Sequence, residues 1–252
     1  MRVDVVTLFP EFFDPWLRTG VCSRAVVQGT LQVVRWNPRQ FAADVHQTVD
    51  DRPYGGGPGM VMIPTVLAAA IRAIRQDCAS VSVTPGPTVL LSPAGQRLDQ
   101  AWVEARLSTS APRQFTLVCG RYEGIDQRFI DRYVDLELSL GDFVLSGGEI
   151  PALAVLDAIA RRLPGVLGDP ASSEQDSFMN GLLDHPHYTR PEVFEDLRVP
   201  EVLLSGHHGK IMDWRTSQSR SITQARRPDL HAAVLAGQVA LKATRQNSSE
   251  ND

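Results

Sequence analysis

The sequence predicts an α/β fold with a largely parallel sheet, followed by a smaller and mostly helical second domain. Short β-branched runs alternate with helical patterns over the first two thirds of the chain, which is typical of a parallel sheet covered by helices. Residues 164–177 then interrupt this alternation with proline, glycine, serine and acidic residues. The chain has 252 residues, 43% of them hydrophobic, which suffices for one sizeable core and a smaller satellite.

Each expected element rests on a local pattern. A short apolar or alternating run bounded by turn residues predicts a strand, and apolar residues three or four positions apart predict a helix. The strands are expected at 3–9, 31–36, 88–92, 115–119 and 134–140. The helices are expected at 64–76, 98–108, 125–133 and 149–162.

These elements predict an α/β domain over 1–163, a linker over 164–177 and a helical domain over 178–252. The formal net charge is -4, but the charged residues are mainly acidic in 166–204 and mainly basic in 205–245. A basic C-terminal stretch is a mild indication of a polyanionic partner. The alternative is an ordinary solvated helical surface, which the charge pattern alone favours.

The three cysteines are far apart and form no C-x-x-C motif, which indicates neither a zinc site nor a disulfide framework. The first residues, MRVDVVTLFPEFFDPW, carry acids early and lack a long apolar region, so no signal peptide is expected. No apolar run approaches the length of a membrane span. We therefore expect a soluble protein of the reducing cytoplasm.

Several enzyme classes are excluded by their missing motifs. The only two lysines, Lys210 and Lys242, do not stand in a Gly-Lys-Ser/Thr motif, so a Walker-type NTPase is excluded. No G-x-G-x-x-G follows a strand, and the serines beside glycines lack the earlier glycine of a nucleophile elbow. The histidines of DHPHY and GHHG have no recognised zinc spacing, and a structural role is favoured for them.

Three glycine-rich loops remain, at 50–60, 119–126 and 140–152. The last two each follow an expected strand and precede an expected helix. Ligands of open α/β sheets bind beyond the carboxyl ends of the strands, and glycines let the backbone approach them closely. Ordinary tight turns would explain any one of these loops. Three together favour an enzyme with a backbone-lined small-molecule site.

At these loops the sequence resembles the bacterial tRNA (guanine-N1)-methyltransferase family. The segments that carry the resemblance are TVDDRPYGGGPGM, LVCGRYEGID, GDFVLSGGEIPAL, LPGVLG, DSF, HPHYTRP and VLLSGHHGKI, and in this order they extend over nearly the whole chain. The resemblance implies a SPOUT-type, trefoil-knotted α/β domain followed by a helical tRNA-binding domain. It also implies a homodimer that uses S-adenosylmethionine to methylate N1 of the guanine 3′-adjacent to the anticodon, at tRNA position 37.

The same resemblance implies a set of cofactor-binding residues: Pro93, Gly120, Leu140, Gly141, Asp142, Phe143, Val144, Leu145, Gly147 and Gly148. The sequence departs from the family at Ala94, where glutamine is usual, so a side-chain contact is lost there. The family requires magnesium, and Glu123 is a candidate ligand. The alternative for Glu123, and for Asp126 beside it, is a charge that stabilises a helix N-terminus.

For catalysis the resemblance implies that Asp176 is the general base and that Arg161 stabilises negative charge on O6 of guanine. From the residues alone, Asp176 reads as a helix N-cap and Arg161 as a cation at a helix C-terminus. The residues implied to lie near the tRNA are His46, Asp50, Gly59 and Ser172. The linker with Asp176 is expected to cross to the partner subunit, so that the two subunits share each active site.

Two other functions are compatible with these patterns. The first is a SPOUT methyltransferase that modifies another RNA position or a ribose 2′-OH. The second is an RNA-binding module whose cofactor loop is vestigial.

Overall fold

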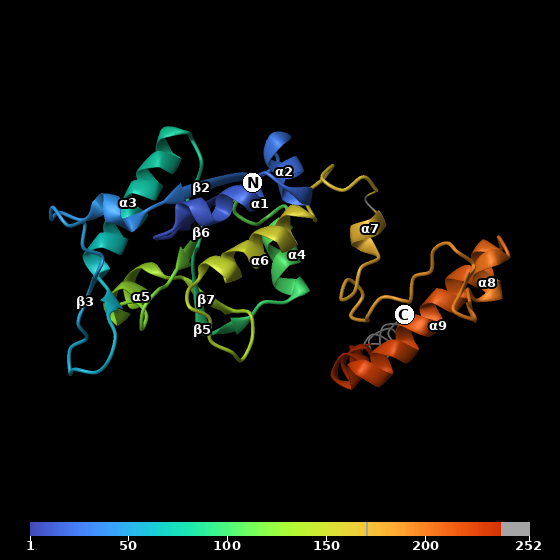
Figure 1. The fold of residues 1–252 in the computed structure, drawn as a ribbon. Helices are drawn as coiled ribbons and strands as arrows, with labels where there is room; N and C mark the ends of the chain where they lie inside the picture. The colour runs from blue at the N-terminus through green and yellow to red at the C-terminus, as the bar shows by residue number, and fades with distance from the viewer. Residues whose placement is uncertain (170, 238–252) are drawn as a thin grey trace, which may run out of the picture. The chain divides into compact units, whose positions relative to one another are not determined.

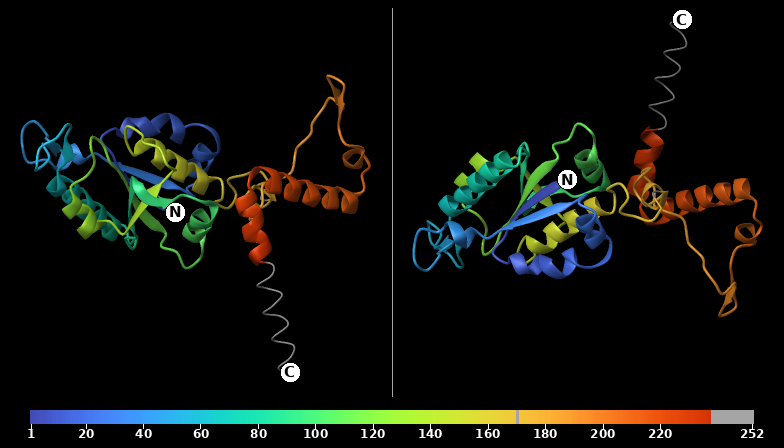
Figure 2. Two further views of the ribbon diagram at one scale, coloured as in Figure 1. Left: turned by 90° about the horizontal axis from the view of Figure 1, so that it is seen from below. Right: turned by 90° about the horizontal axis from the view of Figure 1, so that it is seen from above.

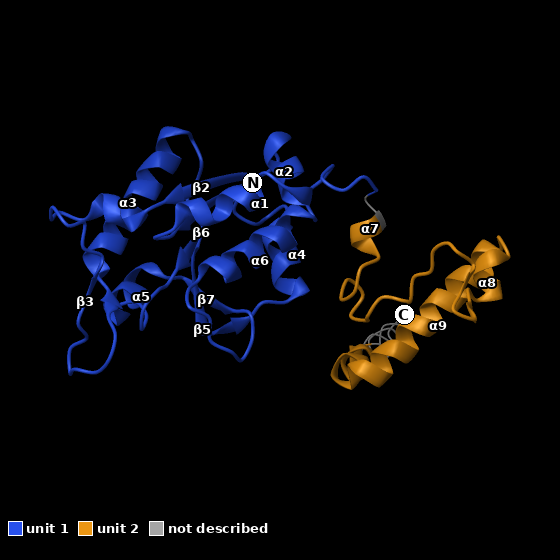
Figure 3. Cartoon of the chain, viewed as in Figure 1, with its two compact units in different colours: residues 1–170 blue, residues 171–252 orange. Residues whose placement is uncertain are grey.

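The computed structural model describes residues 1–169 and 171–237. The chain divides into two compact units, residues 1–170 and residues 171–252, which Figure 3 shows in two colours. The boundary falls within the stretch expected to be a linker. A short helix, α7 (Ala171–Glu174), follows the boundary directly.

Unit 1 is built on a five-stranded sheet in which every strand pair is parallel (Figure 1). From one edge to the other the strands are β2 (Gln32–Trp36), β1 (Arg2–Val6), β6 (Gln114–Cys119), β5 (Thr88–Arg97) and β7 (Leu136–Ser139). A two-stranded hairpin of β3 (Asp50–Asp51) and β4 (Val61–Met62) stands apart from this sheet. The α/β class and the parallel sheet are as predicted.

Helices cover both faces of the sheet, as the two views of Figure 2 show. One face packs against α2 (Gly20–Val27), α4 (Gln100–Leu107) and α6 (Glu149–Ala160), and the other against α3 (Pro64–Ser80) and α5 (Gln127–Tyr133). The short elements η1 (Pro10–Phe13), α1 (Asp14–Leu17) and η2 (Pro38–Phe41) join the first strands. Strand side chains alternate between the two cores: Val3 and Val5 enter the first and Val6 the second.

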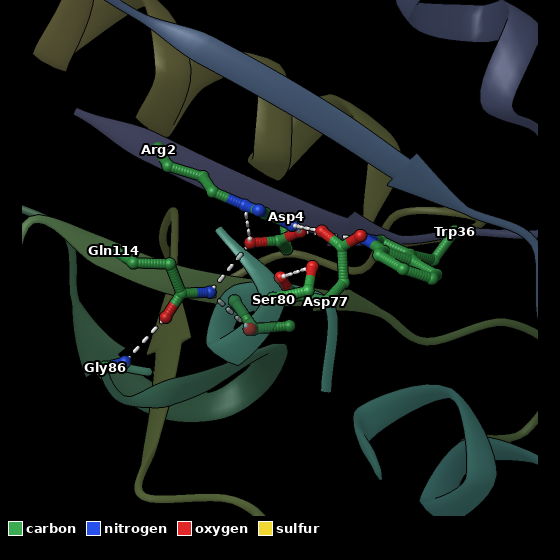
Figure 4. A network of polar contacts seen from close by, with 8 residues as sticks. Arg2, Asp4, Trp36, Asp77, Ser80, Gly86 and Gln114 are labelled. Atoms are coloured by element: carbon green, nitrogen blue, oxygen red, sulfur yellow. Dashed lines mark hydrogen bonds and ion pairs between the residues drawn. The ribbon is translucent and has the colours of Figure 1, made fainter. Parts of the chain in front are cut away.

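Asp4, in the middle of β1, is fully buried, and its carboxylate is hydrogen-bonded to several side chains (Figure 4). Its carboxylate accepts hydrogen bonds from the Arg2 guanidinium at 2.7 and 2.9 Å, from Trp36 Nε1 at 2.8 Å and from Gln114 Nε2 at 2.8 Å. Arg2 also contacts Asp77 of α3 at 2.6 Å. A buried carboxylate is tolerated when several donors satisfy its oxygens. This network joins β2, β1 and β6 to α3.

Strand β5 is longer than expected, and its last part is unusual. Leu138 of β7 pairs with Leu91 and again with Gln96, so β5 meets the same residue of β7 at two places. Between them, Gly95 lies so close to β7 that a Cβ atom would overlap the backbone nitrogen of Leu138. The run TVLLS predicted a strand over 88–92, and only the tertiary contact extends this strand to Arg97.

After α7, unit 2 continues with turns and then with helices. Residues 178–200 form turns and a small hairpin of β8 (Val193–Phe194) and β9 (Leu197–Arg198). Then follow α8 (Glu201–Leu204), α9 (His208–Arg226) and a further helical stretch over 228–237. The rest of the predicted domain, 238–252, lies outside the described residues. Among the described helices, none has the length and apolar content of a membrane span.

Candidate active site

A cavity of about 380 Å³ opens beside residues 90–94 of β5 and at the carboxyl ends of β6 and β7. These three strands are neighbours in the sheet, so the loops that follow them meet at one edge. The loop after β6 reaches toward α5, and the loop after β7 reaches toward α6. Gly148 N donates to Gly120 O at 3.0 Å and ties the two loops together. The volume is within the range of ligand pockets.

The structure brings most of the predicted cofactor residues to this cavity. Nine of the ten line it: Pro93, Gly120, Leu140, Gly141, Phe143, Val144, Leu145, Gly147 and Gly148. Asp142 is not among the lining residues; its side chain is 94% exposed and faces Arg97 at 3.4 Å. Ala94 also lines the cavity.

Two glycines of the loop after β7 are needed for different reasons. Gly141 has a φ of +153°, a conformation that other residues rarely adopt. Gly148 has an ordinary φ, but a Cβ there would lie 2.6 Å from the Cα of Cys119. Gly148 therefore lets α6 begin against the end of β6.

Other lining residues were not predicted: Leu90, Leu91, Ser92, Arg121, Tyr122, Glu137, Ser139 and Ser146 are among them. They lie in the first half of β5, in β7, or in the two loops that carry the predicted glycines. The sequence feature that could have identified some of them is their place at the end of a predicted strand. Side-chain type alone does not separate them from core or surface residues.

The glycine-rich loop between β3 and β4 docks onto the loop after β6. Glu123 N donates to Met60 O at 3.0 Å, and Met62 N donates to Gly124 O at 2.9 Å. A Cβ on Gly59 would overlap the side chain of Glu123. Gly59, predicted to lie near the tRNA, thus makes room for the carboxylate that was predicted to bind magnesium.

Asp50 and Tyr122 form a second connection between these loops. Burial, together with a hydrogen bond to the Asp50 carboxylate, raises the pKa of the Tyr122 hydroxyl. Tyr122 holds a φ of +59°, which is uncommon outside glycine. His46 is exposed in the preceding turn, where its backbone nitrogen donates to Asp44 at 3.0 Å. Asp50 therefore lies beside the cavity wall.

Arg161, one of the two predicted catalytic residues, does not line this cavity. Arg161 is the C-cap of α6, whereas Gly148 at the cavity is its N-cap. The helix has 12 residues, so its two ends are separated by about 18 Å. Asp176 and Ser172 belong to unit 2. Asp176 starts a turn, in which Met179 N donates to its carbonyl at 3.3 Å, so the N-cap alternative is wrong.

The reading of Asp126 as a charge at a helix N-terminus is confirmed. Asp126 is the N-cap of α5, and its carboxylate accepts from Arg128 N at 2.9 Å. The Asp126 carboxyl also bonds the Arg128 guanidinium, which lowers its pKa. Glu123 lies three residues earlier, in the loop, and does not cap this helix.

One described group has the donor types of a metal site: Asp184, His185 and His187 of unit 2 offer ligand atoms within 4.8 Å of one another. The Asp184 carboxylate bonds His185 Nδ1 at 2.6 Å and His187 Nε2 at 2.8 Å. These bonds already satisfy the atoms that face each other. Imidazole nitrogens are also poor ligands for magnesium, which prefers oxygen. The group does not account for the predicted magnesium requirement.

Comparison with known proteins relates these loops to one family. Residues 1–233 match the family model described as tRNA (Guanine-1)-methyltransferase TrmD. A tRNA (guanine-N(1)-)-methyltransferase of Bordetella parapertussis is 57% identical over 233 residues, 91% of this chain and 90% of the relative. Proteins with the same name from Methylibium petroleiphilum and Polynucleobacter necessarius are 55% and 54% identical, over 94% and 91% of this chain and 92% of each relative.

Proposed function

This chain belongs to the tRNA (guanine-1)-methyltransferase TrmD family, and from that premise we propose that it methylates N1 of a guanine in tRNA. The family is one of methyltransferases, which implies S-adenosylmethionine as the donor. When bound, S-adenosylmethionine supplies a methyl group on a positively charged sulfur. The target we propose is the guanine 3′-adjacent to the anticodon, position 37.

The cavity beyond β5, β6 and β7 is the observation that carries this proposal. Five glycines line it, and at glycines the backbone N–H and C=O groups can approach an adenine edge and a methionine chain closely. Apolar side chains such as Leu138 and Ile130 line it as well. Its volume of about 380 Å³ fits a ligand of this size. The residues present therefore suit S-adenosylmethionine. Asp142 is the one predicted cofactor-binding residue to whose side chain we assign no contact with S-adenosylmethionine.

The chemistry at guanine requires a base, because N1 carries a proton and is a poor nucleophile until that proton leaves. We assign proton removal to the Asp176 carboxylate, which the family motif around DSF supports. Negative charge then develops on O6, and a fixed guanidinium nearby stabilises it most in the transition state. We assign this role to Arg161.

The length of α6 supports a site shared between two copies of the chain. Its first turn adjoins the cavity, and Arg161 lies at its far end, about 18 Å away. Arg161 of the same chain thus cannot reach a guanine held at that cavity without a large rearrangement. We propose a homodimer in which the cofactor loop of one subunit meets Asp176 and Arg161 of the other.

For unit 2 we propose contact with the tRNA anticodon stem. Helix α9 carries several cations with exposed or half-exposed side chains: Lys210, Arg215, Arg220 and Arg226. Contacts between such cations and phosphates make binding strongly dependent on salt. His46, Asp50 and Gly59 stand on or beside the β3–β4 hairpin, and we propose that this hairpin borders the flipped guanine. Ser172 would approach the RNA from α7.

Magnesium is a separate part of the proposal. Among the described residues, Glu123 belongs to no group of three potential ligands. A magnesium ion usually keeps several waters and uses one or two carboxylates together with substrate oxygens. Glu123 fits that pattern because it lines the cavity and is exposed.

We also propose that the chain is knotted at the cavity. The family resemblance carries this proposal, and the two pairings of Leu138, with Leu91 and with Gln96, fit it because β5 leaves its regular register with β7 between them. Gly95 permits the close crossing. Such a crossing runs against the general rule that chains do not thread loops.

A methyl-transfer assay tests the proposed function. Purified protein and S-adenosylmethionine are incubated with tRNA transcripts that carry guanine or adenine at position 37, and the products are mapped by mass spectrometry. We expect N1-methylguanosine at position 37 of the first transcript and no methylation there in the second. Methylation at another base or on ribose would assign the chain to a different reaction. Absence of S-adenosylmethionine binding in calorimetry would favour the RNA-binding module.

A further inference from the structure

We propose that a buried ion pair between Arg121 and Glu149 holds the loop after β7, residues 140–148, in its cofactor-binding form. This inference rests on the proposed function of the cavity. It assigns Arg121 and Glu149 as positioning residues, because their charged groups contact protein atoms rather than a reacting atom. Neither residue was among the predicted site residues.

Glu149 is the first residue of α6, and only 1% of its surface is exposed. One carboxylate oxygen accepts from Thr7 Oγ1 at 2.8 Å, and the other lies 2.8 Å from Arg121 Nη2. A carboxylate so deeply buried is costly unless a cation and hydrogen-bond donors compensate it. Thr7 follows β1, so Glu149 links the end of β1 to the start of α6.

Arg121 connects the same carboxylate to the loop after β7. Its Nη1 donates to Ser146 O at 3.1 Å, and its guanidinium lies 4.5 Å from the ring centre of Phe9. A Cβ on Gly147 would overlap Arg121 Nε. The end of the loop is therefore shaped around the guanidinium, which occupies the space left by Gly147.

The loop needs such an anchor because its tip is poorly packed. Val144 is 84% exposed and Phe143 is 54% exposed, although both line the cavity. At the start of the loop, Ser139 Oγ accepts from Gly141 N at 3.1 Å. At its end, Ser146 O accepts from Arg121. A loop with few buried apolar contacts opens easily, and ordering it during ligand binding lowers affinity.

The first measurement is S-adenosylmethionine affinity by calorimetry. For Arg121→Ala we expect about a tenfold or greater rise in Kd, equivalent to about 1.4 kcal/mol or more. Arg121→Lys keeps a charge that can reach Glu149 but loses the planar fork, so an intermediate Kd is expected. The matched control is Arg97→Ala. This variant removes an exposed ion pair with Asp142 of the loop 140–148, and we expect the Kd to change by less than about twofold.

The second measurement separates positioning from direct ligand contact. Amide hydrogen exchange is followed over residues 140–148 in the cofactor-free protein. If Arg121 holds the loop, Arg121→Ala speeds exchange there while amides of β1 and β6 keep their protection. Unchanged exchange in the loop would overturn the proposal, even with weaker binding, because it would indicate a direct contact with the ligand.

Thr7→Val provides a variant that removes one hydrogen bond to Glu149 without removing a charge. We expect a rise in Kd of about twofold to fivefold, with tRNA affinity unchanged. Normal affinity in both Arg121→Ala and Thr7→Val would also overturn the proposal. A different result would overturn the proposed function itself: the unmodified protein would then not bind S-adenosylmethionine at all.

Discussion

The side chain of Glu123 occupies the space next to the Cα of Gly59 that any other residue at position 59 would need. These two residues are far apart in the chain, yet their loops are also joined through Met60 O and Glu123 N. Glu123 lines the cavity, so the glycine of one loop controls the position of a carboxylate on the other.

Gly59→Ala should therefore displace Glu123 and lower kcat/KM for tRNA methylation by about tenfold or more. Gly56→Ala is a close control: the φ angles are +76° at Gly59 and +75° at Gly56, but a Cβ at Gly56 meets nothing within 4 Å. Backbone strain is thus the same in both variants, and only the contact with Glu123 differs. Equal losses in the two variants would show that this contact does not matter.

Asp176→Asn removes the proposed base while it keeps the shape of the side chain. Single-turnover methyl transfer should fall by at least about a hundredfold, with S-adenosylmethionine affinity unchanged. Glu174→Gln changes an exposed carboxylate two residues earlier and should leave the rate within about twofold. A rate for Asp176→Asn close to that of the unmodified protein would remove Asp176 from the mechanism.

A shared site predicts complementation between two inactive variants. One subunit carries Asp176→Ala, and the other carries Gly141→Arg, which places a side chain where φ is +153° at the cavity. In the mixed dimer, one site combines an intact loop with an intact Asp176, and activity returns to one site per dimer. The measurement is turnover of purified heterodimers with two different tags. Folded heterodimers that stay inactive would contradict the shared site. Gly148 is less suitable for this test, because a substitution there would separate α6 from β6.

Asp4→Ala tests the buried network of Figure 4. The change leaves donors of Arg2, Trp36 and Gln114 buried without their acceptor, so the free energy of unfolding should fall by about 3–5 kcal/mol. Asp14→Ala breaks a more exposed ion pair with Arg35 and should cost about 1 kcal/mol or less. Urea unfolding followed by circular dichroism measures both. If the free energy of unfolding falls by a similar amount in both variants, burial does not strengthen the contacts of Asp4.

The Asp184 carboxyl should make stability depend on pH at the acid side. Burial alone would raise its pKa, but hydrogen bonds from His187 and His185 outweigh burial and lower it. A lowered pKa in the folded state stabilises the protein fully above the unfolded value of about 3.9, and this contribution disappears as pH falls through the folded value. Asp184→Asn should therefore unfold more easily than the unmodified protein at pH 7, and the difference should shrink below about pH 4. A difference that stays constant with pH would exclude this carboxyl as the cause.

Much of unit 1 could be predicted because its strands are short β-branched runs that alternate with amphipathic helices. The cavity was predictable for a related reason: glycines directly after β6 and β7 stand where a parallel sheet binds ligands. Nine residues predicted by family resemblance meet at that cavity. The local pattern contributed the loops, and the resemblance contributed the individual residues.

The rest depended on contacts that no local pattern encodes. Glu149 at the start of a helix looks like a surface charge near the helix dipole, yet it is buried against Thr7 and Arg121. Gly59 looks like one more turn glycine until Glu123 is seen beside it. In both cases a partner from a distant segment determines the role of the residue.

The double pairing of Leu138 affects how this part of the protein resists mechanical force. Strand β7 meets β5 at Leu91 and at Gln96, so pulling β7 sideways has to break both contacts at once. The contacts join residues about 40 positions or more apart in the sequence, and such long-range contacts form slowly during folding. During synthesis the segment 92–97 also leaves the ribosome before β7 does. An unfolding enzyme that pulls on β7 would therefore have to break the contacts with β5 beside the cavity.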